Sequence, residues 1–223
     1  LAAFLAGQDH PGLQTGRKPW GRELHMAFLY PGETDPWRAG AARLAAEIPA
    51  FAEAMADLDG PLRRTAALTA DRVLHDGTVW DQPSAASPSL VAVQLALTTW
   101  WRTCGVGPQV AVGRGHGELA AAAAAGILGV DDALRIAAAL ASGDGARAVG
   151  EVPHREAVLP FVSALDGRLY RGRDLPTDHW LDCGNSGGGW ESALVGLGDR
   201  RPNVWLHLGA ASLECPGAVV AAT

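Results

Sequence analysis

The chain has 223 residues, with 18 basic and 24 acidic side chains and therefore a formal net charge of −6. This acidic balance argues against a general nucleic-acid-binding protein, and no run reaches the roughly 18 apolar residues of a membrane span, so we expect neither nucleic acid nor a membrane as a partner. Hydrophobic residues make up 48% of the chain and charged residues 19%, which excludes intrinsic disorder and favours one large domain or two small ones.

The first residues of the chain predict where its domain begins, and its cysteines predict its cellular compartment. Residues 1–24 begin apolar and then become rich in turn residues, so we expect a linker ahead of a domain at residues 25–223. The chain opens without a methionine or a basic leader, which we interpret as an excerpt from a longer polypeptide without a secretory signal. Cys104, Cys183 and Cys215 lack C-x-x-C spacing, so we expect reduced thiols in a cytoplasmic protein, with neither disulfides nor a zinc site.

The first predicted elements are a strand and two helices. The run from Met26 to Tyr30 is compact and apolar and is followed by a Pro-Gly pair, which is typical of a buried strand. From Arg38 to Leu58 apolar residues recur at steps of three and four, and Pro49 interrupts them. We therefore expect two consecutive helices rather than one.

The rest of the chain alternates between predicted helices and strands. Ser87-Pro88 places a capping hydroxyl before a proline, which predicts a helix that begins there and ends near Cys104. Later patterns predict strands at residues 109–113, 160–164 and 203–208, and helices at residues 118–128 and 131–142. Strands separated by helices that stop at glycine indicate an α/β fold with a parallel sheet.

The turn after the second predicted strand carries the strongest functional signal. It reads Val112-Gly113-Arg114-Gly115-His116-Gly117-Glu118-Leu119. A strand that enters a sharp Gly-x-x-x-Gly turn and leaves in a helix is the layout of a nucleophile elbow, where glycines flank a serine on strained backbone. The helix N-terminus behind the turn supplies N–H groups for an oxyanion. Here the central residue is Gly115, so the sequence encodes the elbow without its nucleophile.

The motifs along the chain resemble those of the acyltransferase domain of modular polyketide synthases, a family related to malonyl-CoA:acyl carrier protein transacylases. The family's Gly-His-Ser-x-Gly-Glu, followed by an alanine-rich helix, is similar to residues 113–126. Other segments are similar in the same order: Phe-Leu-Tyr-Pro-Gly at 28–32, Pro-Ser-Leu-Val-Ala-Val-Gln at 88–94, Pro-Phe-Val-Ser-Ala at 160–164 and Asp-His-Trp-Leu at 178–181. Residues 1–16 resemble the tail of the linker between ketosynthase and acyltransferase domains.

The resemblance implies a three-layer, α/β-hydrolase-like core around a short parallel sheet. Only nineteen residues separate Leu140 from Pro160, where the family inserts a small ferredoxin-like subdomain that carries its catalytic histidine. We therefore expect a truncated domain that lacks this subdomain. The partners that the resemblance implies are neighbouring ketosynthase and acyl carrier protein domains, with a trans-acting acyltransferase as a further candidate, and it implies no cofactor and no metal.

The residues to which the resemblance assigns catalysis are replaced in this chain. Gly115 stands for the serine that attacks the acyl thioester, and Arg114 for the histidine before it. The loop that helps to hold the oxyanion carries Glu33. The arginine that pairs with the malonyl carboxylate should fall near Leu140 or Ala141, neither of which can form a bidentate pair.

Three further family positions are also altered or unmatched. The asparagine that usually orients the catalytic histidine is Cys183, and the late Gly-Pro-His is Gly-Ala-Ala at residues 209–211. His154 lies in the shortened segment but outside the family's motif, so no catalytic role is assigned to it. Loss of the nucleophile of a serine hydrolase costs on the order of 10⁶ in turnover, which is about 8 kcal/mol of transition-state stabilisation. We therefore predict a catalytically inactive acyltransferase-like domain that acts as a structural spacer or docking platform in a polyketide synthase.

An enzymatic alternative stays open at this stage, in which a non-serine nucleophile supports residual acyl transfer or thioester hydrolysis. It would use His116, Glu118 or a cysteine, although a histidine just after the apex is more typical of a solvated turn. Arg114 and the glycine turn could retain binding of an anion or CoA, but the turn matches neither G-x-G-x-x-G nor a P-loop. The degenerate candidate site is thus centred on Gly115 and flanked by Arg114, His116, Gly117 and Glu118, with Glu33 at the former oxyanion loop.

The remaining conspicuous residues are expected to be structural. Glu118 is expected to cap or tether the elbow helix. Trp100-Trp101 is expected to form core and packing surface. Four histidines lack metal-ligand spacing and are assigned ordinary surface or core roles: His25, His75, His179 and His207. Loss of the subdomain is expected to uncover apolar surface near residues 141–160 and the elbow, unless polar substitutions or another protein cover it.

Overall fold

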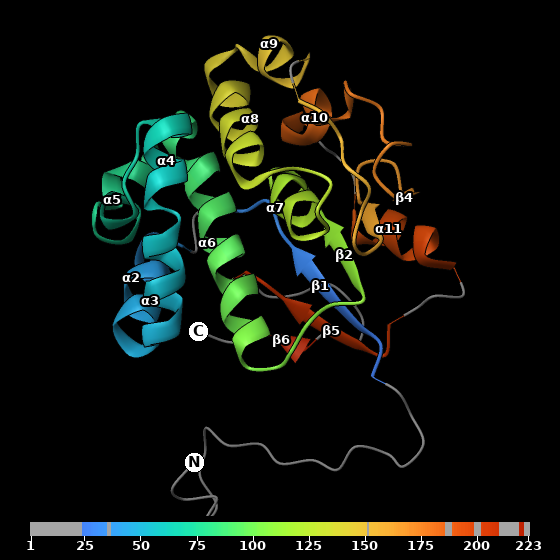
Figure 1. The fold of residues 1–223 in the computed structure, drawn as a ribbon, viewed down its shortest axis with the longest axis horizontal. Helices are drawn as coiled ribbons and strands as arrows, with labels where there is room; N and C mark the ends of the chain where they lie inside the picture. The colour runs from blue at the N-terminus through green and yellow to red at the C-terminus, as the bar shows by residue number, and fades with distance from the viewer. Residues whose placement is uncertain are drawn as a thin grey trace, which may run out of the picture.

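The computed structural model describes residues 24–34, 37–150, 152–185, 189–198, 202–209 and 219–220. Its centre is a six-stranded sheet of order β4-β3-β2-β1-β5-β6 (Figure 1). The strands are β1 (Met26–Tyr30), β2 (Val110–Gly113), β3 (Phe161–Ser163), β4 (Leu169–Tyr170), β5 (Val204–His207) and β6 (Val219–Val220). Neighbours pair in parallel, except that β3 and β4 are antiparallel. The linker predicted at residues 1–24 lies almost entirely outside the described residues.

Alternating side chains of the strands pack into two separate cores, one on each face of the sheet. Phe28 and Tyr30 of β1 belong to the larger apolar cluster, whereas Ala27 and Leu29 belong to a smaller one. Successive residues of a strand point to opposite faces, so a strand that is apolar at every position requires cover on both sides. Such continuous apolar runs are typical of parallel sheets.

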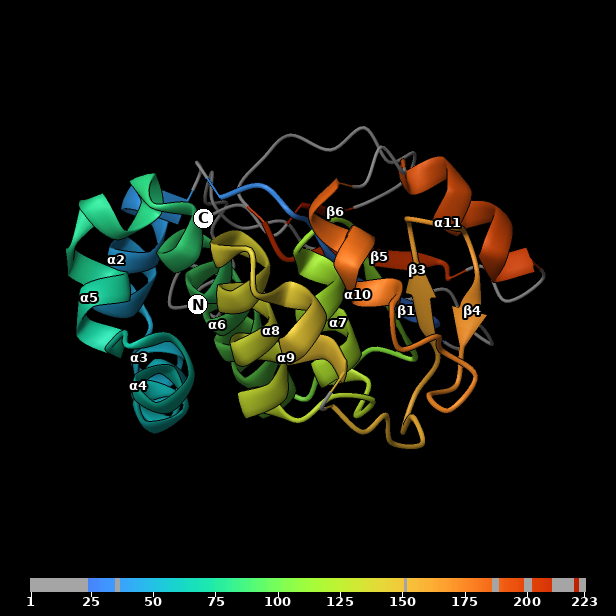
Figure 2. The same ribbon diagram turned by 90° about the horizontal axis from the view of Figure 1, so that it is seen from above.

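The larger core lies between the sheet and most of the helices. These are α2 (Trp37–Glu47), α3 (Pro49–Asp57), α4 (Asp59–Ala66), α5 (Ala70–His75), the 3₁₀ helix η1 (Gly77–Asp81), α6 (Pro83–Thr103), α7 (Gly117–Ala124), α8 (Val130–Ser142) and α9 (Gly145–Gly150). Helix α7 contacts β1 and β2 directly, and α6 packs against α3, α7 and α8. Both views show α2 to α5 on the side of α6 that faces away from the sheet (Figures 1 and 2).

The opposite face of the sheet is covered by α11 (Trp190–Leu197), whose Ala193 and Leu197 are buried in the smaller core. The short α10 (His179–Asp182) and η2 (Cys183–Asn185) precede it. The helix–sheet–helix arrangement confirms the predicted three-layer α/β core with a short, mainly parallel sheet. Within the described part of the chain, no helix has the length and apolar character needed to cross a membrane.

Two of the predicted helix bounds are wrong. Helix α6 begins at Pro83 rather than at Ser87, and it contains Pro88 in its interior. All side chains from Ala85 to Thr98 are buried, so this burial outweighs the roughly 3 kcal/mol that an internal proline costs a helix. Helix α7 ends before its predicted bound, because Gly126 adopts a φ of +83° just beyond it. The split of the earlier helical segment at Pro49 is confirmed.

The short connection between α8 and β3 folds back onto the core. Its described residues form α9 and a loop, and they bury Val149 and Val152 in the larger cluster. Val158 is the exception, with 80% of its surface exposed. The sequence predicted that apolar surface near residues 141–160 would be uncovered. This prediction is wrong for most of the described part of the connection, because apolar side chains of the connection itself pack on the larger core.

Candidate functional site

The turn between β2 and α7 has the geometry of a nucleophile elbow. Gly115 stands at its apex with a φ of +58°, the left-handed backbone that side-chain-bearing residues avoid. The Arg114 amide donates a hydrogen bond to the Tyr30 carbonyl oxygen at 3.0 Å, and the Glu118 amide donates to the Gly115 carbonyl oxygen at 3.0 Å. The predicted elbow is thus present, and a hydrogen atom occupies the place of its side chain.

The glycines on either side of the apex are required by close backbone approach. A Cβ atom on Gly117 would lie 2.5 Å from the Pro31 carbonyl oxygen and closer still to that of Tyr30. A Cβ atom on Gly113 would lie 2.9 Å from Cγ of Glu118, again too close. The elbow helix therefore enters directly against β1, as the glycine spacing predicted.

The loop after β1 lies against the elbow, where the sequence predicted an oxyanion loop. A Cβ atom on Gly32 would meet the Arg114 carbonyl oxygen at 2.9 Å and the His116 amide nitrogen at 3.2 Å. Glu33 forms an ion pair with Arg114, whose guanidinium also lies 5.7 Å from the ring centroid of Trp190. The positive charge beside the apex is therefore compensated by the chain's own carboxylate rather than left available to an anion.

A pocket of about 380 Å³ adjoins the elbow. His116 and the loop after β1 form one side of it, and Leu140 and Ala141 of α8 form another. Its complete lining is Gly32, Thr34, Trp80, Asp81, Pro83, Ala86, Ser87, His116, Leu140, Ala141, Leu181 and Gly184. This set contains no arginine or lysine, so the described lining has no cation to hold a carboxylate. Leu140 and Ala141, which the sequence analysis placed where the family has its carboxylate-binding arginine, line the same pocket as His116 of the elbow.

Two polar groups of this pocket could take part in chemistry. Burial lowers the pKa of His116 below its ordinary value, so the imidazole is neutral near pH 7. Ser87 is 3% exposed, and within the described residues its Oγ has no hydrogen-bond partner. His116 is half-buried in the wall of the pocket, so it is less solvated than the turn histidine that the sequence predicted.

His154, in the shortened connection, has both ring nitrogens engaged. Its Nδ1–H donates to the Leu175 carbonyl oxygen at 3.0 Å, and its Nε2 accepts from the Trp180 indole N–H at 2.9 Å. Partial burial is the main reason why the pKa of His154 is lowered. These bonds fix a neutral tautomer that braces the connection.

Glu118 tethers the elbow helix to the later part of the chain, as predicted. Its carboxylate is fully buried, and Oε1 accepts from the Ser163 hydroxyl at 2.8 Å and the Leu165 amide at 3.1 Å. Oε2 accepts from His179 Nε2–H at 2.7 Å and lies 3.8 Å from Cys183 Sγ. The lining of the elbow pocket does not include Glu118.

The pairing of His179 with Glu118 was missed by the sequence reasoning. The two residues are 61 positions apart, and no local pattern links them. The available signal was the spacing of four between His179 and Cys183, which places both on one face of a helical turn. Burial, followed by the nearby Glu118 carboxylate, raises the pKa of the Cys183 thiol well above its ordinary value, so this cysteine is a poor nucleophile.

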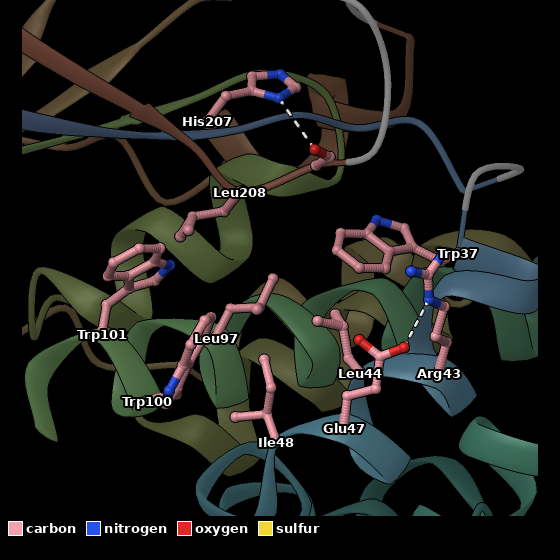
Figure 3. Close-up of a pocket in the computed structure, with 11 residues that line it drawn as sticks. Trp37, Arg43, Leu44, Glu47, Ile48, Leu97, Trp100, Trp101, His207 and Leu208 are labelled. Carbon is pink, nitrogen blue, oxygen red and sulfur yellow. Dashed lines mark hydrogen bonds and ion pairs between the residues drawn. The ribbon is translucent and has the colours of Figure 1, made fainter. Parts of the chain in front are cut away.

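A second, apolar pocket of about 230 Å³ lies at the C-terminal end of α6 (Figure 3). Trp100 and Trp101 of α6 lie at one end of it, with ring centroids 4.8 Å apart, and Trp37 of α2 lies at the other. His207 and Leu208 approach from the end of β5. Trp100 and Trp101 are half-buried and pack against the larger core, as predicted, and they also line this pocket, which includes no residue of the elbow.

Comparison with known proteins identifies the family. The acyl transferase domain family matches residues 27–151. Erythronolide synthase EryA3 of Saccharopolyspora erythraea is 34% identical over 141 residues, which are 62% of this chain and 4% of that protein. Polyketide synthase GfsA of Streptomyces halstedii is 33% identical over 177 residues, or 76% of this chain and 2% of that protein. The chain thus spans only a small part of these relatives.

Solved structures show the same fold. The acyltransferase domain from the second module of the salinomycin polyketide synthase superimposes with a TM-score of 0.78 at 20% identity, over 93% of this chain and 68% of that one. The acyl transferase domain of SpnD gives a TM-score of 0.76 at 16% identity, over 98% of this chain and 74% of that one. With its elbow and these matches, the chain belongs to the acyl transferase domain family, as an acyltransferase domain of the modular polyketide synthase type.

Proposed function

We propose that this acyltransferase domain does not catalyse acyl transfer and that it serves a polyketide synthase as a structural spacer or docking platform. The observation that carries the proposal is Gly115 at the apex of an otherwise intact elbow. The chemistry of the fold needs an oxygen nucleophile at this point, and removal of such a group costs on the order of 10⁶ in turnover. The effect is about 8 kcal/mol, far more than hydrogen bonds elsewhere in the pocket supply.

The groups around the apex support the same proposal. Arg114 is paired with Glu33. His154 is bonded to Leu175 and Trp180. Because the described pocket lining has no basic side chain that stays charged, a malonyl carboxylate would lose its ion-pair partner on entering. The nucleophile, a histidine free to act in the family's catalytic position, and the carboxylate clamp are thus lacking together from the described site.

The enzymatic alternative receives less support from the geometry. Glu118 and Cys183 are buried, Glu118 Oε2 contacts both His179 Nε2 and Cys183 Sγ, and neither residue lines the pocket. His116 does line the pocket and is the group that a residual thioester hydrolase would use. A neutral imidazole can act as a base toward water, so this alternative has its own direct test.

The test of inactivity is intact-protein mass spectrometry after incubation with malonyl-, methylmalonyl- and acetyl-CoA. A serine-bearing acyltransferase domain treated in parallel gives the positive control. We expect no acyl adduct on the native chain, and CoA release equal to that of a His116→Gln variant. A covalent adduct, or CoA release that His116→Gln abolishes, would overturn the proposal.

The variant Gly115→Ser separates loss of the nucleophile from loss of the whole site. We expect it to remain without transferase activity, because His154 is held by Leu175 and Trp180 and the pocket lacks a clamp. Robust malonyl transfer by this variant would show that a functional base is present after all.

The spacer role predicts partners that the domain contacts without modifying them. By the family's organisation these are neighbouring ketosynthase and acyl carrier protein domains, and a trans-acting acyltransferase is a further candidate. We propose a cytoplasmic location for the assembly. Deleting the domain from its parent synthase should lower product yield and disturb assembly, whereas unchanged assembly and yield would rule out a scaffold role.

A further inference from the structure

Three chemically distinct ligand groups meet beneath the elbow helix. Glu118 comes from the first turn of α7, His179 from α10 and Cys183 from η2. One carboxylate oxygen, one imidazole nitrogen and the thiol sulfur all lie within 4.8 Å of one another. All three residues are buried. The fold thus brings together donors that are dispersed in the sequence.

We propose that Glu118, His179 and Cys183 form a binding site for a thiophilic divalent cation, best represented by Zn²⁺. Zinc accepts carboxylate oxygen, imidazole nitrogen and thiolate sulfur in the same site. Binding of the cation releases the proton of the Cys183 thiol to solvent and leaves the His179 ring proton on Nδ1, so that Nε2 is free to ligate. The carboxylate and the thiolate then carry two negative charges, which a divalent cation neutralises without leaving net charge in the core. The inference goes beyond the proposed spacer function and does not depend on it.

The surroundings of the carboxylate match those of a metal ligand. Its Oε1 is held by the Ser163 hydroxyl and the Leu165 amide, which directs Oε2 toward His179 and Cys183. Such outer hydrogen bonds orient the first ligands of metal sites and raise their affinity. This geometry favours monodentate coordination of the metal by Oε2 of Glu118.

The imidazole lies in an aromatic shell. The centroid of its ring is 6.5 Å from that of Phe161, 5.6 Å from that of Tyr170 and 5.2 Å from that of Trp180. An apolar shell of this kind lowers the local dielectric constant and strengthens the attraction between a cation and its ligands. It also fixes the ring, so that little side-chain entropy remains to be lost when a metal binds.

Shifts on the order of 1 Å admit the ion, since the three ligand atoms already lie within 4.8 Å of one another. Ligand bonds of about 2.0 Å to nitrogen or oxygen and 2.3 Å to sulfur place tetrahedral ligand atoms about 3.3–3.6 Å apart. The Glu118 Oε2 atom is 2.7 Å from His179 Nε2 and 3.8 Å from Cys183 Sγ. Insertion therefore requires the carboxylate and the imidazole to separate by about 0.6 Å, with a water molecule as fourth ligand.

The experiment uses the whole chain, stripped with a chelator and then titrated with Zn²⁺ against a chromophoric competitor. We expect one bound equivalent, and Co²⁺ in place of Zn²⁺ should give the sulfur-to-metal absorption band of a thiolate ligand. Cys183→Ser, which is nearly isosteric, should weaken Zn²⁺ binding by at least 100-fold. Cys104→Ser and Cys215→Ser remove the other thiols and should leave binding unchanged.

The outcomes separate a metal site from a hydrogen-bonded cluster. Saturable binding that Cys183→Ser loses while the other two variants keep it supports the proposal. The proposal is overturned if the folded native chain binds no Zn²⁺, or if Cys183→Ser binds it equally well. Because the Co²⁺ band is measured on the native chain, its absence also overturns the proposal, whether or not Cys183→Ser folds.

Discussion

A methyl group on Gly117 tests the close approach on which the elbow depends. In Gly117→Ala the new Cβ would lie 2.5 Å from the Pro31 carbonyl oxygen and 2.6 Å from the Tyr30 carbonyl carbon. Ordinary van der Waals contact is about 3.4–4 Å, and both neighbours are backbone atoms that cannot rotate away. Overpacking of this kind costs 1–3 kcal/mol, and we expect the upper end, about 3 kcal/mol, because β1 or α7 must shift as a unit.

Urea unfolding followed by circular dichroism measures this cost. With a slope of about 2–3 kcal/mol per molar for a domain of this size, the midpoint of Gly117→Ala should fall by roughly 1 M. Gly107→Ala is the matched control, because a Cβ there meets nothing within 4 Å, and its midpoint should stay the same or rise slightly. Equal midpoints for the two variants would refute the tight elbow.

The remaining predictions concern the buried polar groups. Glu118→Ala should lower the free energy of unfolding by about 3–5 kcal/mol, because it leaves the buried donors of Ser163, Leu165 and His179 unpaired. Glu47→Ala is the control in the same denaturation assay: it breaks the exposed ion pair with Arg43 and should cost under about 1 kcal/mol. The pKa of His154, measured by NMR, should lie below 6.5, mainly because burial lowers it. The unfolded chain then binds a proton more readily than the folded one, so the stability that His154 contributes is present above about pH 6.5 and is lost as the pH falls. A measured pKa at or above 6.5 would contradict this. A thiol reagent should label the exposed Cys104 in the native protein and the buried Cys183 only after unfolding. Peptide mass spectrometry identifies the labelled cysteine, and labelling of Cys183 in the native protein would contradict the prediction.

The sheet and the elbow could be predicted from the sequence because their signals are local. Continuous apolar runs marked β1, β2, β3 and β5, and the spacing of Gly113 and Gly117 marked the elbow turn between a strand and a helix. The short strands β4 and β6 were missed, since two residues carry no periodicity. Helices α4 and α5 were missed as well, because they are short and mostly polar.

The sequence predicted only those parts of the candidate site that are formed by residues close together in the chain. Arg114 and Glu33 were each recognised as substitutions, but their ion pair joins residues 81 positions apart and could not be read from either segment. The same holds for His154, whose partners Leu175 and Trp180 lie 21 and 26 residues away. Pairings of this kind depend on how the later strands and helices are arranged, which no local pattern encodes.

The left-handed backbone of Gly115 links the position of the family's nucleophile to the stability of the fold. A side-chain-bearing residue held at a φ of +58° stores about 1–3 kcal/mol of backbone strain, whereas glycine adopts this angle almost without cost. A Gly115→Ser substitution would therefore add strain to the turn, and the domain would become less stable before any gain in activity.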